Sequence, residues 1–204
     1  MGPTPNIGVL ISGRGSNLQA LIDATREGRL DAVIRVVISN RFDARGLQRA
    51  QEAGIETLVL PHTDYASRED YDRALAAELT ARGVGLVCLA GFMRLLGPVF
   101  LDAFPNAVLN IHPSLLPSFP GIDAQRQAIE HGVTVSGATV HFVTPELDAG
   151  PIVLQAAVPV ERDDTPETLA ARILVEEHRL YPEAVRLVLA GGWRLEGRRF
   201  LTGR

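Results

Sequence analysis

The first half of this sequence alternates short apolar runs with amphipathic stretches, and no other feature restricts the fold of the chain so strongly. Short apolar runs are typical of strands that are covered on both faces. The expected strands are Ile7–Ile11, Val33–Ile38, Glu56–Leu60, Leu86–Ala90 and Ala107–Ile111. The expected helices are Asn17–Glu27, Ala44–Ala53 and Ser67–Arg82. Strands that alternate with helices in this way predict an α/β fold with a doubly wound, mostly parallel sheet.

The second half of the sequence departs from this alternation. The prolines around Ser114–Gly121 exclude regular structure there. The elements expected beyond it are a helix at Ala124–Glu130, β runs at Val133–Val143 and Ile152–Val160, a helix at Thr165–Leu189 with a kink or break at Pro182, and a hairpin or ordered tail at Trp193–Leu201. The two β runs predict an antiparallel pair. No linker or repeat is visible, so we expect a single domain over residues 1–204.

The basic residues are all of one kind, because the 20 Lys and Arg residues are all arginine. Without lysine there can be no Schiff-base enzyme and no phosphate-binding P-loop. A protein kinase is excluded for the same reason. A bias of the genome toward GC-rich arginine codons is the simplest explanation for the absence of lysine. Most of the arginines are then expected to be ordinary surface residues.

Net charge and cysteine content indicate the setting in which the chain works. The net charge of −4 argues against a general nucleic-acid partner. A single cysteine, Cys88, allows no disulfide framework and suits a reducing cytoplasm. Because no signal peptide and no apolar segment of membrane length are visible, we expect a cytoplasmic protein without a membrane partner.

A glycine-containing turn, Ser12–Asn17, joins the first expected strand to the first expected helix. Glycines let a backbone approach an anion closely, and a helix N-terminus offers unpaired N–H groups. The turn therefore predicts a phosphate site, although a plain glycine turn with an asparagine cap explains the same residues. The pattern lacks GxGxxG, so it does not indicate a dinucleotide.

Asn110 and His112 end an apolar strand, and alternate residues of a strand share a face. An amide N–H can stabilise a developing oxyanion, and an imidazole can exchange protons near neutral pH. The alternative is a capped strand end with a hydrogen-bonded histidine. Asp148 lies in the turn between the two later β runs. It is expected to have a catalytic role only if its carboxylate contacts His112, because a carboxylate can orient an imidazole and stabilise its cation.

Three other residues carry weaker signals. His141 lies within a β run, where a lone histidine is more often structural than catalytic. Glu177 and His178 lie on the late helix, where a solvated charged face is the ordinary explanation. No spacing of His, Cys, Asp or Glu indicates a metal site, so no metal is expected.

Four segments together resemble the phosphoribosylglycinamide formyltransferase family, the folate-dependent transformylases of purine (IMP) biosynthesis. They are Ile11–Ala20, Leu89–Arg94, Asn110–Pro117 and Gly137–Gly150. The run Asn110-Ile111-His112-Pro113-Ser114-Leu115-Leu116-Pro117 is the most specific of them. The resemblance covers nearly the whole chain. It implies an enzyme that transfers formyl from 10-formyltetrahydrofolate, as co-substrate, to the amine of glycinamide ribonucleotide.

The resemblance also implies roles for individual residues. Its catalytic residues fall on Asn110, His112 and Asp148, and its substrate-binding residues on Gly15, Ser16, Asn17 and Glu177. Its folate-binding residues fall on Arg68, Leu89, Phe92, Met93, Arg94, Leu95, Leu96 and Val143. The N-terminal half is thus expected to bind the phosphate and the C-terminal half to hold the catalytic groups and folate. In this mechanism Asp148 orients His112 and favours its charged form.

The sequence departs from the family pattern at four positions, Asp123, Gln125, Pro145 and Leu174, and no role is carried to them. Two related formyl-folate enzymes, methionyl-tRNA formyltransferase and formyltetrahydrofolate deformylase, carry an additional domain, which a chain of this length is not expected to hold. A non-catalytic nucleotide- or folate-binding module would be expected to have lost Asn110, His112 or Asp148, and all three are present. The oligomeric state stays open, with a homodimer as one option.

Overall fold

The computed structural model describes residues 3–203 and divides into two compact units, Met1–Leu109 and Asn110–Arg204. The division falls inside one strand, β5 (Val108–His112), between Leu109 and Asn110. Each unit is described by itself below. The expectation of a single domain remains a prediction.

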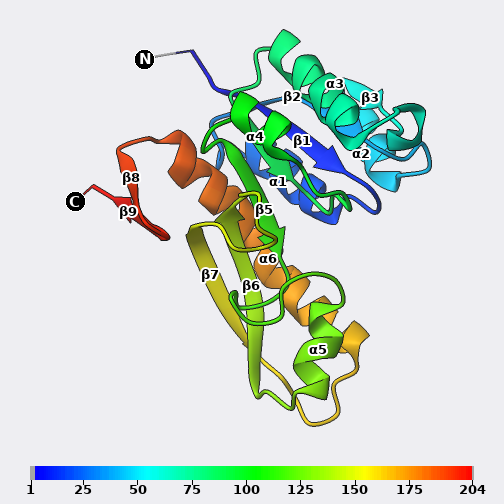
Figure 1. Cartoon of the computed structure of the whole chain (residues 1–204). Helices are drawn as coiled ribbons and strands as arrows, with labels where there is room; N and C mark the ends of the chain where they lie inside the picture. Colours follow the sequence, from blue (N-terminus) through cyan, green and yellow to red (C-terminus); the bar gives the residue numbers. More distant parts are fainter. Residues whose placement is uncertain (1–2, 204) are drawn as a thin grey trace. The chain divides into compact units, whose positions relative to one another are not determined.

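The first unit contains the expected alternation of strands and helices (Figure 1). Its strands are β1 (Asn6–Ile11), β2 (Val33–Ser39), β3 (Thr57–Val59) and β4 (Leu86–Leu89). Its helices are α1 (Ser16–Arg26), α2 (Arg45–Glu52), α3 (Arg68–Ala81), α4 (Pro98–Ala103) and the short 3-10 turn η1 (His62–Asp64). The expected strands and helices are confirmed with small shifts at their ends, whereas α4 and η1 were not expected.

The strand order of the first unit, β3-β2-β1-β4, contains a reversal of direction. The chain first builds outward from β1 to β2 and β3, and then returns through α3 to place β4 on the other side of β1. All of these pairs are parallel, so a doubly wound arrangement is confirmed. In such sheets ligands bind beyond the carboxyl ends of the strands where the order reverses, here after β1 and β4.

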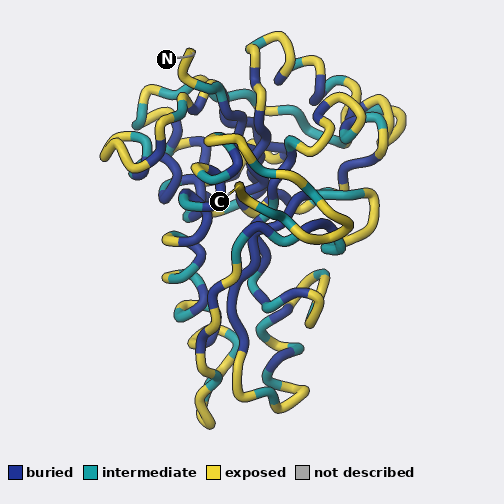
Figure 2. The backbone as a smooth tube through the Cα atoms, turned by 90° about the vertical axis from the view of Figure 1, so that its left-hand side faces the viewer, coloured by how far each residue is buried: buried dark blue, intermediate teal, exposed yellow. Residues whose placement is uncertain are grey.

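Strands β1 and β4 are almost wholly buried, whereas β3 and much of the connecting chain are partly or fully exposed (Figure 2). Ile7, Val9, Leu10 and Ile11 of β1 are all 0% exposed. The near-continuous apolar run of β1 follows from this burial, since a strand covered on both faces has no solvent side that would select polar residues. Contacts between α1 and α2, and between α3 and α4, complete the unit.

The second unit is built on an antiparallel pair. Its strands after β5 are β6 (Val135–Phe142), β7 (Ile152–Pro159), β8 (Trp193–Glu196) and β9 (Arg199–Thr202), and its helices are α5 (Ala124–Glu130) and α6 (Pro166–Leu189). β6 and β7 pair antiparallel, as expected, and β8 and β9 form the last hairpin. The strand order is β6-β7-β9-β8, and α6 packs against β6 and β7 (Figure 1).

Helix α6 begins with a capping box, in which Thr165 and Thr168 exchange side-chain and backbone hydrogen bonds. Of the kink or break expected at Pro182, the break is wrong, because the helix continues through that residue. Tyr181 and Ala184 on either side of it are fully buried, and this packing offsets the hydrogen bond that proline removes. No helix within residues 3–203 combines the length and the apolar character that crossing a membrane requires.

We expect the substitution Gly137→Ala to destabilise the β6–β7 pair. A Cβ at Gly137 would lie 2.0 Å from the Ala156 carbonyl oxygen, so the backbone of the two strands must move apart. Overpacking of this kind costs about 1–3 kcal/mol of unfolding free energy, measurable by urea denaturation. The control Gly85→Ala, where the nearest atom is 3.9 Å away, should change stability by less than ~0.5 kcal/mol. Equal losses in both variants would contradict the steric explanation.

Candidate active site

The turn after β1 has the features of an anion site. Gly15 is the N-cap residue of α1, with a left-handed φ of 69°, and no side chain caps the helix. No acidic residue lies in its first turn, so the positive end of the helix dipole is not neutralised. A Cβ on Gly15 would lie 2.5 Å from the Gly46 Cα, so glycine is required here both by conformation and by space. The predicted substrate residues Gly15, Ser16 and Asn17 all lie at this helix N-terminus.

Most of the predicted folate residues lie at the end of β4 and just after it, and the structure divides these into two groups. Leu89, Phe92 and Leu96 are buried in the first unit. Met93 and Leu95 are 71% and 57% exposed, and Arg94 is partly exposed. Arg68, at the start of α3, keeps 47% of its side chain exposed. The side chains of the second group and of Arg68 are thus the more accessible to a ligand.

Four side chains converge in the second unit, and three of them are the predicted catalytic residues. Asn110 and His112 come from β5, His141 from β6, and Asp148 from the turn after β6. His112 Nδ1 lies 3.5 Å from Asp148 Oδ2, and His141 Nε2 lies 3.6 Å from Asp148 Oδ1. Asn110 Nδ2 lies 3.2 Å from His141 Nε2. The side chains of His112, His141 and Asp148 are all at most 9% exposed.

The hydrogen bonds of His112 identify which ring nitrogen carries its proton. Nε2 lies 2.9 Å from the carbonyl oxygen of Phe119, and a carbonyl can only accept, so Nε2 donates. In the neutral ring, Nδ1 then carries a lone pair that faces Asp148. A lone pair and a carboxylate oxygen repel one another, which fits their separation of 3.5 Å. A proton added at Nδ1 would convert this contact into an ion pair.

Burial controls the charge of this cluster. Burial lowers the pKa of His112 below its usual value, although the Phe119 carbonyl and Asp148 both raise it. Burial would also raise the pKa of Asp148, but His141, the Gly121 N–H group and His112 outweigh it, and the net pKa is lowered. The Gly121 N–H donates to Asp148 Oδ2 at 2.8 Å. These pKa shifts favour the charged carboxylate of Asp148 and disfavour the charged form of His112, whereas the family resemblance implies a charged His112.

We expect an NMR titration of the His112 ring protons to give a pKa below about 6.5, the ordinary value for histidine. Replacing Asp148 with asparagine should lower this pKa further, because the carboxylate favours the imidazolium. The control Asp123→Asn removes a charge elsewhere and should leave the pKa of His112 unchanged. A pKa above 6.5 in the parent chain, or a rise in Asp148→Asn, would contradict this electrostatic description.

His141 belongs to the cluster, although the sequence favoured a structural role for it. Its Nδ1 donates to the Phe142 carbonyl oxygen at 2.9 Å, which in the neutral ring leaves Nε2 as an acceptor for the Asn110 amide. Thr139 and His141 are polar residues at alternate positions of the otherwise largely apolar β6, and this pattern could have indicated a shared polar face. The pattern alone could not have shown that the face meets Asp148.

The other predicted residues of the second unit have distinct environments. Glu177 is 7% exposed, so its interpretation as part of a solvated helix face is wrong. Val143 directly follows β6 and is partly exposed. Within residues 3–203, no group of three or more His, Cys, Asp or Glu side chains has an arrangement that could hold a metal ion.

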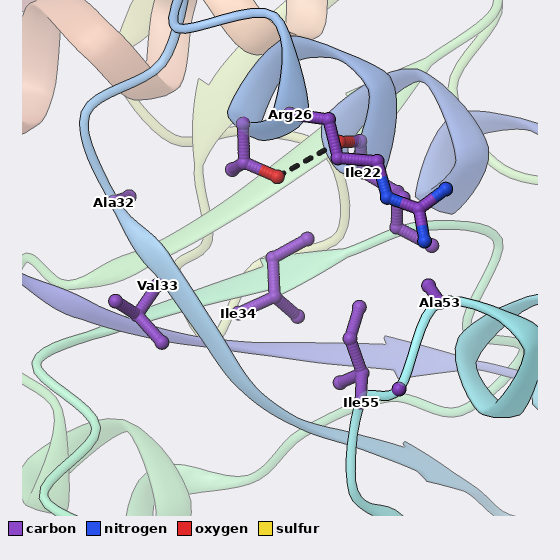
Figure 3. Close-up of a pocket in the computed structure, with 9 residues that line it drawn as sticks. Ile22, Arg26, Ala32, Val33, Ile34, Ala53 and Ile55 are labelled. Carbon is purple, nitrogen blue, oxygen red and sulfur yellow. Dashed lines mark hydrogen bonds between the residues drawn. The ribbon is translucent and has the colours of Figure 1, made fainter.

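An apolar cavity of about 300 Å³ lies elsewhere in the first unit (Figure 3). It is lined by residues such as Ile22, Ile34 and Ile55, with the Arg26 guanidinium beside them. These residues come from the end of α1, the start of β2 and the chain just before β3. The cavity is therefore at the amino ends of the strands, opposite to the edge that carries the binding loops. We assign it no role in the chemistry.

Comparison with known proteins gives matches over most of the chain. The profile described as formyl transferase matches residues 5–185. The phosphoribosylglycinamide formyltransferase of Escherichia coli K12 is 49% identical over 193 residues, which cover 95% of this chain and 88% of that protein. The human trifunctional purine biosynthetic protein adenosine-3 is 52% identical over 91% of this chain, but the match covers only 18% of its own length. This chain thus spans about a fifth of such trifunctional relatives.

Solved structures give the same result. The crystal structure of glycinamide ribonucleotide transformylase 1 from Symbiobacterium toebii superposes with a TM-score of 0.96 at 60% identity, covering 98% of this chain and 94% of that one. A phosphoribosylglycinamide formyltransferase from Coxiella burnetii gives a TM-score of 0.92 at 43% identity, covering 97% of this chain and 93% of that one. These matches confirm the resemblance and the fold class that the sequence indicated. The roles of individual site residues remain predictions.

Proposed function

This chain belongs to the formyl transferase family, and on that premise we propose that it transfers a formyl group from 10-formyltetrahydrofolate to the amine of glycinamide ribonucleotide. The products are formylglycinamide ribonucleotide and tetrahydrofolate, and the reaction belongs to purine biosynthesis. The names of the relatives support the substrate, and the buried cluster of Asn110, His112 and Asp148 supports the chemistry.

The observation that carries the proposal is the buried imidazole of His112, whose Nδ1 faces the Asp148 carboxylate at 3.5 Å. Formyl transfer joins the amine nitrogen to the formyl carbon and breaks the bond from that carbon to the folate nitrogen. The amine must lose one proton and the folate nitrogen must gain one. A group that accepts and then returns a proton near neutral pH meets this need, and such groups contribute roughly 10²–10⁴-fold to rates.

In the proposed mechanism, His112 takes up the amine proton at Nδ1, and Asp148 stabilises the imidazolium that forms. Negative charge develops on the formyl oxygen, and an N–H of the Asn110 amide donates a hydrogen bond to it. His112 then returns the proton to the folate nitrogen. The bond from Nε2 to Phe119 holds the ring orientation throughout.

The phosphate of glycinamide ribonucleotide is assigned to the N-terminus of α1, at Gly15, Ser16 and Asn17. Backbone N–H groups and the helix dipole supply the positive potential there, so a lysine is not required. Glu177 is assigned to the ribose, because a carboxylate accepts hydrogen bonds from hydroxyl groups. These assignments rest on family resemblance together with the uncapped helix N-terminus.

The chemistry of the residues fits an amphipathic folate. Met93 and Leu95 expose apolar side chains that suit its ring system, and Arg68 offers a planar, partly exposed guanidinium that suits a carboxylate. When bound, 10-formyltetrahydrofolate supplies the formyl group and the nitrogen that receives the proton. The proposal requires no metal and no nucleic acid. A cytoplasmic location is also proposed, and the single buried thiol of Cys88 is consistent with it.

The test is a direct assay of the two substrates. The protein is mixed with 10-formyltetrahydrofolate and glycinamide ribonucleotide, and release of tetrahydrofolate is followed by absorbance. We expect turnover that depends on both substrates, with formylglycinamide ribonucleotide as the product. Release of free formate, or formylation of methionyl-tRNA in place of this amine, would overturn the proposal.

A further inference from the structure

The segment between β4 and α4 must keep a fixed shape without regular secondary structure. It contains Met93 and Leu95, whose side chains are mostly exposed and therefore give the backbone little support. Phe92 and Leu96 are buried, but apolar packing is not directional and does not fix the position of an N–H group. Directional contacts are needed to hold the backbone of this segment in one conformation.

Ser12 supplies the first of these contacts. It follows β1, is 6% exposed, and uses its hydroxyl twice. The hydroxyl accepts from the Met93 N–H at 2.8 Å and donates to the Asn40 side-chain oxygen at 2.6 Å. The Ser12 N–H also donates to the Gly91 carbonyl oxygen at 3.1 Å. One buried serine thereby fixes the beginning of the segment to the end of β1.

Asp72 supplies the second contact, at the other end of the segment. It lies inside α3 and is 1% exposed, which is unusual for a carboxylate without a close ion pair. Its Oδ2 accepts from the Gly97 N–H at 2.7 Å, whereas the Arg68 Nε is 3.9 Å away. A Cβ on Gly97 would lie 2.8 Å from this oxygen, so the close approach depends on glycine. The hydrogen bond to Gly97 accounts for the position of this buried acid.

We propose that Ser12 and Asp72 are positioning residues that fix the backbone of residues 93–97 at its two ends and thereby set the affinity for the formyl donor. The identity of the ligand, a formyl donor, rests on the proposed function. The anchoring of residues 93–97 by Ser12 and Asp72 does not. Neither residue touches a ligand in this scheme. They hold the backbone so that the exposed side chains of Met93 and Leu95 present one fixed surface.

The effect should fall on the formyl donor more than on the ribonucleotide, because the phosphate turn has contacts of its own. The Gly46 N–H donates to the Gly13 carbonyl oxygen at 3.0 Å, and the Arg49 guanidinium donates to the Arg14 carbonyl oxygen at 3.0 Å. These bonds remain when the hydroxyl of Ser12 is removed. The KM values for the two substrates therefore separate a local effect on residues 93–97 from a general loss of structure.

The experiment measures kcat and both KM values for Ser12→Ala, Asp72→Ala and Asp72→Asn in the full chain. Loss of one hydrogen bond predicts a rise of about 3–10-fold in the KM for 10-formyltetrahydrofolate in the two alanine variants. The KM for glycinamide ribonucleotide and kcat should change by less than about twofold. Asp72→Asn keeps an acceptor oxygen for Gly97 and should recover most of the affinity.

A second measurement does not depend on catalysis. Amide hydrogen exchange at Met93 and Gly97 should become faster, by about 3–10-fold, in Ser12→Ala and Asp72→Ala respectively. The matched control is Ser39→Ala, since Ser39 is 0% exposed and its hydroxyl exchanges two hydrogen bonds with the Arg41 backbone only. This control should lower stability without changing either the exchange at these two amides or the KM for the folate.

The outcomes distinguish the two proposals. Faster exchange without any turnover in the parent chain would refute the proposed function and leave the anchoring of residues 93–97 supported. Unchanged exchange and unchanged KM in the alanine variants would overturn the positioning role. Changes of equal size in both KM values, matched by Ser39→Ala, would also overturn it, because they would report only a loss of stability. If Asp72→Ala does not fold, Ser12→Ala and Asp72→Asn still decide the question.

Discussion

The variant His112→Ala loses at least about 10²–10³-fold in kcat, while its KM values stay within a few-fold of those of the parent chain. The reason is that the substitution removes the imidazole whose unprotonated Nδ1 faces Asp148 Oδ2 at 3.5 Å. Without it, the amine proton has no acceptor of suitable pKa. Single-turnover and steady-state kinetics of formyl transfer measure this loss.

Chemical rescue sharpens this prediction. The side chain of His112 is 6% exposed, so its removal leaves a space in which free imidazole can bind. Added imidazole should restore part of the activity of His112→Ala and none of the activity of Asn110→Ala, whose missing group is an amide. Near-normal turnover in His112→Ala with intact binding would remove His112 from the mechanism.

Asp148→Asn has the second large expected effect, a loss of about 10²–10⁴-fold in kcat. Asparagine keeps the shape of the side chain and an oxygen that accepts from the Gly121 N–H. It removes the charge that stabilises the His112 imidazolium, so the proton is accepted less readily. Steady-state kinetics at several pH values measure the loss, which increasing the concentration of either substrate should not reverse.

The control for this variant is Asp123→Asn. Both Asp123 and Asp148 have left-handed backbones, with φ of 56° and 49°, and asparagine tolerates this conformation well. Each substitution therefore removes one negative charge, and the two should have the same small effect on the backbone conformation. Asp123→Asn should retain full activity. Similar losses in the two variants would show that the charge of Asp148 has no specific role.

The sequence was sufficient to predict β1 and β4, because their apolar runs are buried on both faces. It was not sufficient for α4, whose six residues are too few to show a helical period. The continuity of α6 through Pro182 also could not be predicted, since it depends on the packing of neighbouring residues such as Tyr181. Local patterns cannot report packing that arises between distant segments.

The same limit applies to the site. Asn110 and His112 were predictable, because two polar residues at alternate positions end an apolar strand. The meeting of His141 with Asp148 was not predictable, because Asp148 lies in an irregular turn after β6 whose path the local sequence pattern does not define. The lowered pKa of His112 likewise depends on how deeply the folded chain buries its ring. Sequence identified the chemical groups, and only the fold set their distances and charges.

The division of the chain between Leu109 and Asn110 has a consequence for gene recombination. Asn110, His112, His141 and Asp148 all follow this point, whereas the phosphate turn and the segment between β4 and α4 precede it. A crossover placed there, between two members of the family, would transfer the four residues of the proposed catalytic cluster as one block. Chimeras made in this way would inherit the catalytic rate from one parent, and the recognition of phosphate largely from the other.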